Sequence, residues 1–242
     1  MEAEALQRMR AVEGEHWWFV GRRAILADTL SRIGLPRSAR ILEAGCGPGG
    51  NLAMLSMFGD VSAIEPDAES ASYARERGTA EIRIGRMPGD LPFERGSFDL
   101  VAVLDVLEHL PDDRAGLVAL RQMLKPKGML LATVPAFRLL WSEHDRRHHH
   151  YRRYTRPMLI EAATKAGFEV LRASYFNTAL FPLIAAIRVV RNLLGAPGGN
   201  DEAMPPSFVN ALLRRLFAAE RIALRRFDLP VGVSILMIGR NP

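Results

Sequence analysis

A short loop of glycines is the part of this sequence best suited to hold a ligand. The stretch ILEAGCGPGG places four glycines within six residues, at Gly45, Gly47, Gly49 and Gly50. Glycine has no side chain, so it adopts positive φ angles readily and lets a ligand touch the main chain. An acidic residue, Glu43, stands two residues before the first glycine. The loop therefore predicts a ligand that contacts bare backbone beside a carboxylate.

The charge of Glu43 indicates which ligand that is. The spacing of Gly45, Gly47 and Gly50 fits the pattern G-x-G-x-x-G, which in dinucleotide-binding folds places a pyrophosphate at a helix N-terminus. A carboxylate at Glu43 would repel a diphosphate, but it suits a ligand with a cationic amino group and no phosphate. S-adenosylmethionine is such a ligand. Glu65, about 20 residues further on, is then placed to accept hydrogen bonds from ribose hydroxyls.

Strand and helix patterns alternate along the first half of the chain. Short apolar runs bounded by acids or turn residues indicate strands, and the expected strands are 39–45, 60–67, 79–85, 97–106 and 128–136. The helices expected between them are 51–59, 68–78 and 112–128. A helix leading into a sixth strand within 156–176, and a seventh strand at 231–242, follow. Repeated βαβ units predict an α/β fold with a parallel, doubly wound sheet.

The chain is expected to form one domain, 1–242. A Gly- and Pro-rich loop, GAPGGNDEAMPPS, separates two amphipathic helical patterns between strands six and seven, and we interpret that region as an insertion. The expected parts are an N-terminal helical lid at 1–37, a cofactor-binding core at 38–135, an acceptor segment with strand six at 136–175, a helical insertion at 176–230 and strand seven at 231–242.

Composition limits the class of protein. The chain has 242 residues and one cysteine, Cys46, so it forms no internal disulfide and suits a reducing compartment. No apolar run reaches the roughly 20 residues that a membrane-spanning helix needs, and the N-terminus lacks the pattern of a secretory signal. We expect a cytoplasmic protein, with peripheral membrane contact left open. The net charge of +5 fits attraction to an anion, or simply an arginine-rich proteome.

Four motifs resemble those of the class I S-adenosylmethionine-dependent methyltransferases, in order and in spacing. They are ILEAGCGPGG, IEPD, LPFERGSFDLVAVLDVLEHL and LKPKGMLLATVP. The resemblance covers roughly residues 38–135, and it is strongest to the group that includes the quinone-biosynthesis methyltransferases. It implies a Rossmann-like doubly wound sheet of seven strands, parallel except for an antiparallel strand seven. It also implies S-adenosylmethionine as the cofactor.

The resemblance assigns cofactor contacts to positions of this chain. It implies that the loop holds the methionine part of the cofactor, through Glu43, Gly45, Cys46, Gly47 and Gly49. It implies that Glu65 holds the ribose, that Arg86 and Met87 border the adenine, and that Asp105 faces the reactive end. Many relatives carry an acid before the LPF motif, where this chain has Arg86, and Asp90 is the candidate replacement.

Catalytic candidates lie after strands four and five. Methyl transfer is an in-line displacement, so the protein must align the acceptor, exclude water and sometimes remove a proton. His109 follows strand four, where a base or an acceptor contact would stand; its alternative role is a helix-start histidine bonded to backbone. The stretch WSEHDRRHHHYRRY follows strand five, at the edge where ligands of such sheets bind. His144 and Asp145 are the preferred catalytic pair.

The same stretch supplies candidates for acceptor binding. Arginine pairs with phosphate or carboxylate through two hydrogen bonds, so its arginines favour an anionic acceptor over a metal, and no metal site is expected. The alternative is a solvated basic face. The substrate-binding candidates are Trp18, Arg22, His148, Tyr151 and Arg152.

The two ends of the chain leave two questions open. Trp17 and Trp18 either pack into the core or form part of a lid that excludes water. In the second helical pattern of the insertion, Asn210, Arg214 and Arg225 share one polar stripe with Arg221. Such a helix either caps the domain or lies on an anionic membrane, so membrane contact is considered for 176–227.

Three functions remain for comparison. The leading hypothesis is methyl transfer to an oxygen of a small or lipid-linked acceptor, with an anionic acceptor as one option. Methylation of RNA or DNA is the alternative, although LDVLEHL stands where amino-methylating nucleic-acid enzymes carry an Asn/Asp-Pro-Pro-aromatic run. A non-catalytic cofactor-binding or membrane-associated partner is the third.

Overall fold

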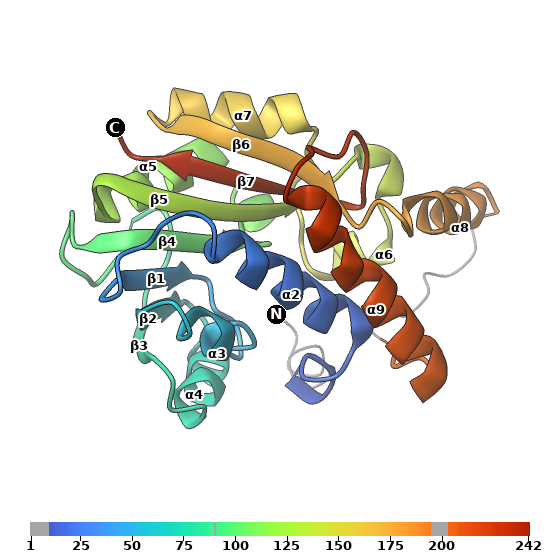
Figure 1. Cartoon of the computed structure of the whole chain (residues 1–242), viewed down its shortest axis with the longest axis horizontal. Coiled ribbons are helices and arrows are strands. Elements are labelled where there is room, and N and C mark those ends of the chain that lie inside the picture. The colour runs from blue at the N-terminus through green and yellow to red at the C-terminus, as the bar shows by residue number, and fades with distance from the viewer. Residues whose placement is uncertain (1–9, 90, 195–202) are drawn as a thin grey trace.

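The computed structural model describes residues 10–89, 91–194 and 203–242, and these form an α/β fold around one seven-stranded sheet (Figure 1). The strand order is β3-β2-β1-β4-β5-β7-β6. The strands are β1 Arg40–Ala44, β2 Asp60–Glu65, β3 Glu81–Ile84, β4 Phe98–Leu104, β5 Leu124–Pro135, β6 Glu169–Phe176 and β7 Ser234–Arg240.

The direction of the strands confirms the expected topology. Strands β1 to β5 pair in parallel, whereas β7 runs antiparallel to both of its neighbours, β5 and β6. The carboxyl ends of β1, β2 and β4 therefore lie side by side at one edge. The strand order reverses between β1 and β4, and it is outside the carboxyl ends at such a point that open α/β sheets bind ligands.

Helices cover both faces of the sheet. On one face lie α2 Trp17–Leu30, α3 Leu52–Leu55, α4 Ala68–Glu76 and α9 Ser207–Leu224; on the other lie α5 Asp113–Met123 and α7 Arg156–Lys165. Figure 1 shows α2 and α9 side by side across the sheet. The short η1 Leu107–His109, η2 Arg138–Leu140 and α6 Glu143–Arg147, and the longer α8 Phe181–Leu193, complete the chain.

The central strands are buried because helices cover both of their faces. Every residue of β4 from Leu100 to Leu104 is buried, and β5 is buried from Leu130 to Pro135. Continuous apolar runs of this kind are typical of strands at the centre of a parallel sheet. Burial of these side chains supplies the main driving force for the fold.

The predicted helix at 112–128 was too long. Helix α5 ends at Met123, and residues 124–127 already belong to β5, where Leu124 pairs with Phe98. Pro126 cannot continue a helix, and Lys125 Nζ donates to both carboxylate oxygens of Asp99 at 2.7 and 2.9 Å, which ties this segment to β4. The predicted helix at 51–59 was also too long, because only Leu52–Leu55 is helical.

Helix α9 packs against the N-terminal helix. Phe217 is fully buried, lies 5.8 Å from Trp17 between ring centroids, and would collide with any side chain at Gly21. Trp17 and Trp18 are both partly buried against this core, which favours the core interpretation of the two rings. Among the described residues, no helix is both long enough and apolar enough to cross a membrane.

The predicted polar stripe of α9 faces the protein in part. Asn210 Oδ1 accepts from the backbone N–H of Trp17 at 2.7 Å, and its amide donates to the carbonyl of Glu15 at 2.9 Å. Arg225 forms an ion pair with Asp28 of α2. These contacts make the insertion a brace for the N-terminal helix.

We predict that Phe217→Ala destabilises the protein by about 3–5 kcal/mol, because it leaves a cavity between α2, α9 and the sheet. Urea unfolding followed by circular dichroism measures the change. The matched control is Phe208→Ala on the same helix, where the ring is 79% exposed, and its effect should stay within about 0.5 kcal/mol. Equal losses of unfolding free energy in both variants would show that the packing of α2 against α9 does not stabilise the protein more than an exposed ring does.

Candidate active site

The glycine loop turns sharply at the carboxyl end of β1. The backbone N–H groups of Gly45 and Cys46 donate to the carbonyl of Ile64 at 2.9 and 3.1 Å, so the loop is tied to β2. The side chain of Cys46 packs into the core, which leaves its backbone as the part that borders the loop.

Gly47 has open space where a side chain would stand. Its φ is +53°, and a Cβ built there would meet no heavy atom within 4 Å beyond its chain neighbours. At Gly45 (φ +77°) a Cβ would instead approach Val106 Cγ2 at 2.8 Å. Gly45 therefore allows close packing, whereas the free side of Gly47 suits a ligand lying against the backbone.

Glu43 offers a buried carboxylate oxygen to that ligand. The residue is 1% exposed, and Asn51 Nδ2 donates to its Oε1 at 2.8 Å. Its Oε2 has no hydrogen-bond partner within the described part of the chain. Burial raises the pKa of Glu43 to about 7, against the lowering effects of Asn51 and Arg22. An orphaned acceptor of this kind fits an ammonium group, as the sequence predicted.

Glu65 lies at the tip of β2 beside the open side of the loop. Its Oε2 accepts from the backbone N–H of Gly47 at 2.9 Å and its Oε1 from that of Asp67 at 3.1 Å. Burial raises the pKa of Glu65, and these two hydrogen bonds oppose the rise. The carboxylate is held next to Gly47, where the predicted contact with a ribose requires it.

Arg22 is a link between α2 and the end of β4. Its guanidinium forms an ion pair with Asp105, its Nη2 lies 3.3 Å from Asn51 Oδ1, and it stacks 4.7 Å from the Trp18 ring centroid. Its Nε is buried without a hydrogen-bond partner among the described residues. The sequence assigned Arg22 to the acceptor. The structure places it against the predicted cofactor residue Asp105, and its role stays a prediction.

A second N-terminal contact clamps the loop from outside. Glu13 pairs with Arg77, whose Nε donates to the carbonyl of Pro48 in the loop at 2.7 Å. Burial raises the pKa of Glu13, although Arg77 and three other arginines lower it. Sequence reasoning missed Glu13 and Asn51. Only Asn51 carries a signal, as the first polar side chain after the glycines.

The predicted adenine border is only partly described. Met87 is buried in the core on the α5 face, and Arg86 is exposed. Asp90, the candidate substitute for the missing acid, lies outside the described residues. The adenine assignment stays a prediction.

Asp145 anchors the segment after β5. It is fully buried and accepts from Arg153 Nε at 2.7 Å, from Arg153 Nη2 at 3.0 Å and from the backbone N–H of Ser142 at 2.8 Å. His150 Nδ1 lies 2.9 Å from its Oδ1. Burial tends to raise the pKa of Asp145, but the hydrogen bonds from His150 and Arg153 hold it below its ordinary value. Asp145 is therefore a charged carboxylate inside the protein.

Three more histidines, His109, His144 and His148, lie near His150. The rings of His144 and His148 lie 4.2 Å apart between centroids, and those of His109 and His150 lie 4.6 Å apart. Burial, followed by His150 and His148, lowers the pKa of His109 to about 4, so His109 is neutral at physiological pH. The catalytic roles of His144, Asp145 and His109 stay predictions.

Tyr151 and Arg152, both predicted to bind the acceptor, differ in how firmly the protein holds their side chains. Tyr151 is 59% exposed, while its backbone N–H donates to the carbonyl of Glu108 at 2.8 Å. Arg152 lies 3.1 Å from Asp113 and donates to the carbonyl of Pro111 at 2.6 Å. The guanidinium of Arg152 thus serves to fix the segment to the start of α5. An acceptor would have to compete with those contacts.

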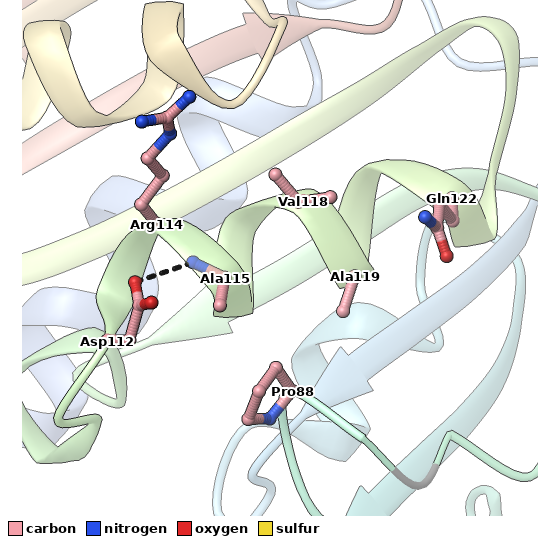
Figure 2. Close-up of a pocket in the computed structure, with 7 residues that line it drawn as sticks. All are labelled: Pro88, Asp112, Arg114, Ala115, Val118, Ala119 and Gln122. Atoms are coloured by element: carbon pink, nitrogen blue, oxygen red, sulfur yellow. Dashed lines mark hydrogen bonds between the residues drawn. The ribbon is translucent and has the colours of Figure 1, made fainter.

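A shallow hollow of about 410 Å³ lies along α5, beside Pro88 (Figure 2). Its lining residues are Pro88, Asp112, Arg114, Ala115, Val118, Ala119 and Gln122. Asp112 accepts from the backbone N–H of Ala115 at 2.9 Å as the N-cap of α5. None of the predicted site residues lines this hollow, so we do not assign it to the active site.

Comparison with known proteins identifies the family. The profile of a family described as a methyltransferase domain matches residues 18–173, more than half of the chain. The chain belongs to this family, the class I S-adenosylmethionine-dependent methyltransferases. Its cofactor is S-adenosylmethionine, and the open loop at Gly47, the orphaned oxygen of Glu43 and the placement of Glu65 fit that ligand.

Curated relatives of this chain include methyltransferases whose names contain a quinone. One is the ubiquinone biosynthesis O-methyltransferase of Xanthomonas campestris pv. campestris (strain B100), 32% identical over 151 residues, or 54% of this chain and 62% of the relative. Another is the demethylmenaquinone methyltransferase of Staphylococcus aureus (strain JH9), 26% identical over 173 residues, or 65% and 67%. The chain thus spans about 62% of the length of the first relative.

A solved structure shares the fold over almost the whole chain. It is the putative methyltransferase in the complex with the Trm112 methyltransferase activator of Haloferax volcanii, with a TM-score of 0.65 and 18% identity. The match covers 99% of this chain and 95% of that one. At this identity it supports the fold alone.

We predict that cofactor binding releases a proton from Glu43. The pKa of about 7 lies above the roughly 4.3 of an unfolded chain, so the proton stabilises the fold at low pH and this stabilisation is lost as pH rises toward 7. An ammonium on Oε2 would favour the charged form. Affinity for S-adenosylhomocysteine should therefore rise about tenfold from pH 6 to pH 8.

Titration calorimetry in two buffers of different ionisation enthalpy measures both the affinity for S-adenosylhomocysteine and the number of protons released on binding. Glu43→Gln should remove the proton release, and the exposed control Glu94→Gln should retain it. Proton release that persists in Glu43→Gln would assign the effect to another group.

Proposed function

We propose that this chain transfers the methyl group of S-adenosylmethionine to an oxygen of a small or lipid-linked acceptor by direct in-line displacement. The observation that carries the proposal is the open glycine loop between two fixed carboxylates, Glu43 and Glu65, at the sheet edge that also holds the histidine-rich segment. Bound cofactor supplies an activated methyl carbon. The protein's own task is to align the acceptor and exclude water.

In this proposal, different residues bind different parts of the cofactor. Glu43 receives the amino group on its free oxygen, and the open backbone of Gly47 lets the methionine part lie close. Glu65 orients the ribose. Asp105, held by Arg22, lies toward the reactive end, and Met87 with Arg86 borders the adenine. Gly45, Cys46 and Gly49 keep the loop in shape.

Relatives favour an apolar, ring-bearing acceptor. The two curated relatives are named for ubiquinone biosynthesis and for demethylmenaquinone, which are lipid-soluble compounds. In this proposal His144, Asp145 and His109 act on the acceptor side. Trp18, Arg22, His148, Tyr151 and Arg152 line the acceptor position, and the positive charge of the two arginines suits an acid group. No metal is assigned a role.

Cofactor binding should be lost in Gly47→Arg, because the side chain fills the space where the ligand lies. Calorimetry with S-adenosylhomocysteine measures the loss, expected to exceed about 100-fold in affinity, or about 2.7 kcal/mol. Gly34→Arg is the matched control, since Gly34 has a similar φ of +73° and open surroundings. Unchanged affinity in Gly47→Arg would refute the cofactor site. Turnover with quinol, lipid and sugar acceptors, against RNA, then tests the acceptor class.

We further propose a cytoplasmic enzyme that contacts anionic membranes through its two late helices. Along α8, Leu183, Ile187 and Val190 are exposed at helical spacing, and Phe208 and Leu212 are exposed on α9. The exposed arginines of this region are Arg191, Arg214, Arg215, Arg225 and Arg226. Apolar side chains with surrounding arginines suit an anionic bilayer, where a lipid-linked acceptor would be found.

Vesicle flotation tests this contact. The protein should float with vesicles that contain phosphatidylglycerol, less with phosphatidylcholine alone, and less again after Phe208→Ser with Leu212→Ser. Met57→Ser, a similarly exposed apolar site on another face, should leave flotation unchanged. The membrane proposal fails when no flotation occurs with either lipid.

A further inference from the structure

Three side chains converge beside the predicted transfer point, and only one of them, His109, already has a role in the proposed function. Glu108 and His109 come from η1, and His150 comes from the loop after α6. A carboxylate oxygen of Glu108 and one ring nitrogen from each histidine all lie within 4.8 Å of one another. The side chain of His150 is 6% exposed, and Glu108 is 1% exposed. Glu108 is therefore buried, whereas the two histidines are intermediate between buried and exposed.

The ring of His150 is held in one orientation. Its Nδ1 lies 2.9 Å from Asp145 Oδ1, and Asp145 is charged, so Nδ1 carries the proton and donates it in the hydrogen bond. Arg153 holds Asp145 through two of its nitrogens. A neutral His150 consequently has its lone pair on Nε2, away from Asp145.

His109 and Glu108 are the members of the cluster that border His150. His109 is neutral, and its ring meets that of His150 edge to face. Glu108 Oε2 is buried with no hydrogen-bond partner among the described residues. Burial raises the pKa of Glu108 well above its ordinary value, and Asp105 raises it further, which favours the protonated carboxyl. A hydroxyl group of a ligand would satisfy both the orphaned carboxyl and the imidazole nitrogen.

We propose that the Glu108–His109–His150 cluster binds the reacting hydroxyl of the acceptor, with His150 as its base and Asp145 as the residue that positions the imidazole. This inference rests on the proposed methyl transfer. The electrostatic interaction of Glu108 with Asp105 places the cluster next to the residue assigned to the reactive end of the cofactor.

The proton balance is simple. The acceptor O–H bond breaks and its proton goes to His150 Nε2, the O–CH₃ bond forms, and the electron pair of the broken C–S bond stays on sulfur. His150 then returns the proton to water. A neutral imidazole matches a phenolic hydroxyl far better than an aliphatic one, because proton transfer is efficient only when the two pKa values are not too far apart. The acceptor class is therefore a phenol or hydroquinone.

Charged and titratable groups from several elements face His150 or lie beside its partners. They are Asp145, Arg153, Glu108, His109, His144, His148 and Asp105. Only an unprotonated imidazole accepts a proton, so the proposal requires the rate to fall at low pH.

The test compares two probes, catechol and 4-nitrocatechol, whose nitro group makes the hydroxyl far more acidic. In His150→Gln, kcat/KM for catechol methylation should fall about 100-fold or more, but by less than about tenfold for 4-nitrocatechol, which needs no base. The loss of rate for catechol at low pH should disappear in His150→Gln, and added imidazole should restore part of the rate in His150→Ala. His149→Asn, exposed and at φ +54°, is the matched control and should leave both rates unchanged.

Other outcomes overturn the inference. Equal losses for both probes, with no change of pH profile, would make His150 merely structural. Failure of wild-type protein to bind 4-nitrocatechol, followed by its absorbance with S-adenosylhomocysteine present, would exclude a phenolic acceptor. A stoichiometric metal ion in the purified protein that is lost in His150→Gln would assign the cluster to a cation. Absence of S-adenosylhomocysteine binding in wild type would instead refute the proposed function itself. Asp145→Asn provides a second variant, expected to lower kcat more than it raises KM.

Discussion

The buried carboxylate of Glu43 is the constraint around which the cofactor edge is arranged. An acid that is 1% exposed is unfavourable unless partners compensate it, and within the described part of the chain only its Oε1 has such a partner, Asn51. The chain keeps the second oxygen free at the start of a loop whose backbone is bare at Gly47. In the proposed function, binding of the cofactor's ammonium group offsets the cost of desolvating Glu43.

The N-terminal helix takes part in that edge because the insertion holds it there. Helix α9 holds α2 in place through the packing of Phe217 and the backbone hydrogen bonds of Asn210. Arg225, which directly follows α9, adds an ion pair. Arg22 thereby reaches Asp105 at the end of β4, some 80 residues away in the chain. An element that the sequence suggested as a cap or membrane helix thus acts on the cofactor site through a second helix.

On the predicted acceptor side, a buried negative charge is compensated by charged and polar partners. Asp145 is fully buried between Arg153 and His150, and its charge is distributed over a network of hydrogen bonds. Such a network fixes the tautomer and orientation of an imidazole at the expense of desolvation. Glu108 joins the two sides, since it neighbours both the histidines and Asp105.

The sequence by itself determined the order of strands and helices, the antiparallel seventh strand implied by the family resemblance, and the residues of the glycine loop. These depend on local periodicity and on motifs whose members are close in the chain. It did not determine that His150 is the imidazole beside Asp145, that Arg22 meets Asp105, or that Glu13 clamps the loop. Those contacts join residues from separate elements, and in a run such as HDRRHHHYRR nothing local says which ring turns inward. Only packing decides, because the buried carboxylate of Asp145 accepts the donors that the folded backbone brings within hydrogen-bonding distance.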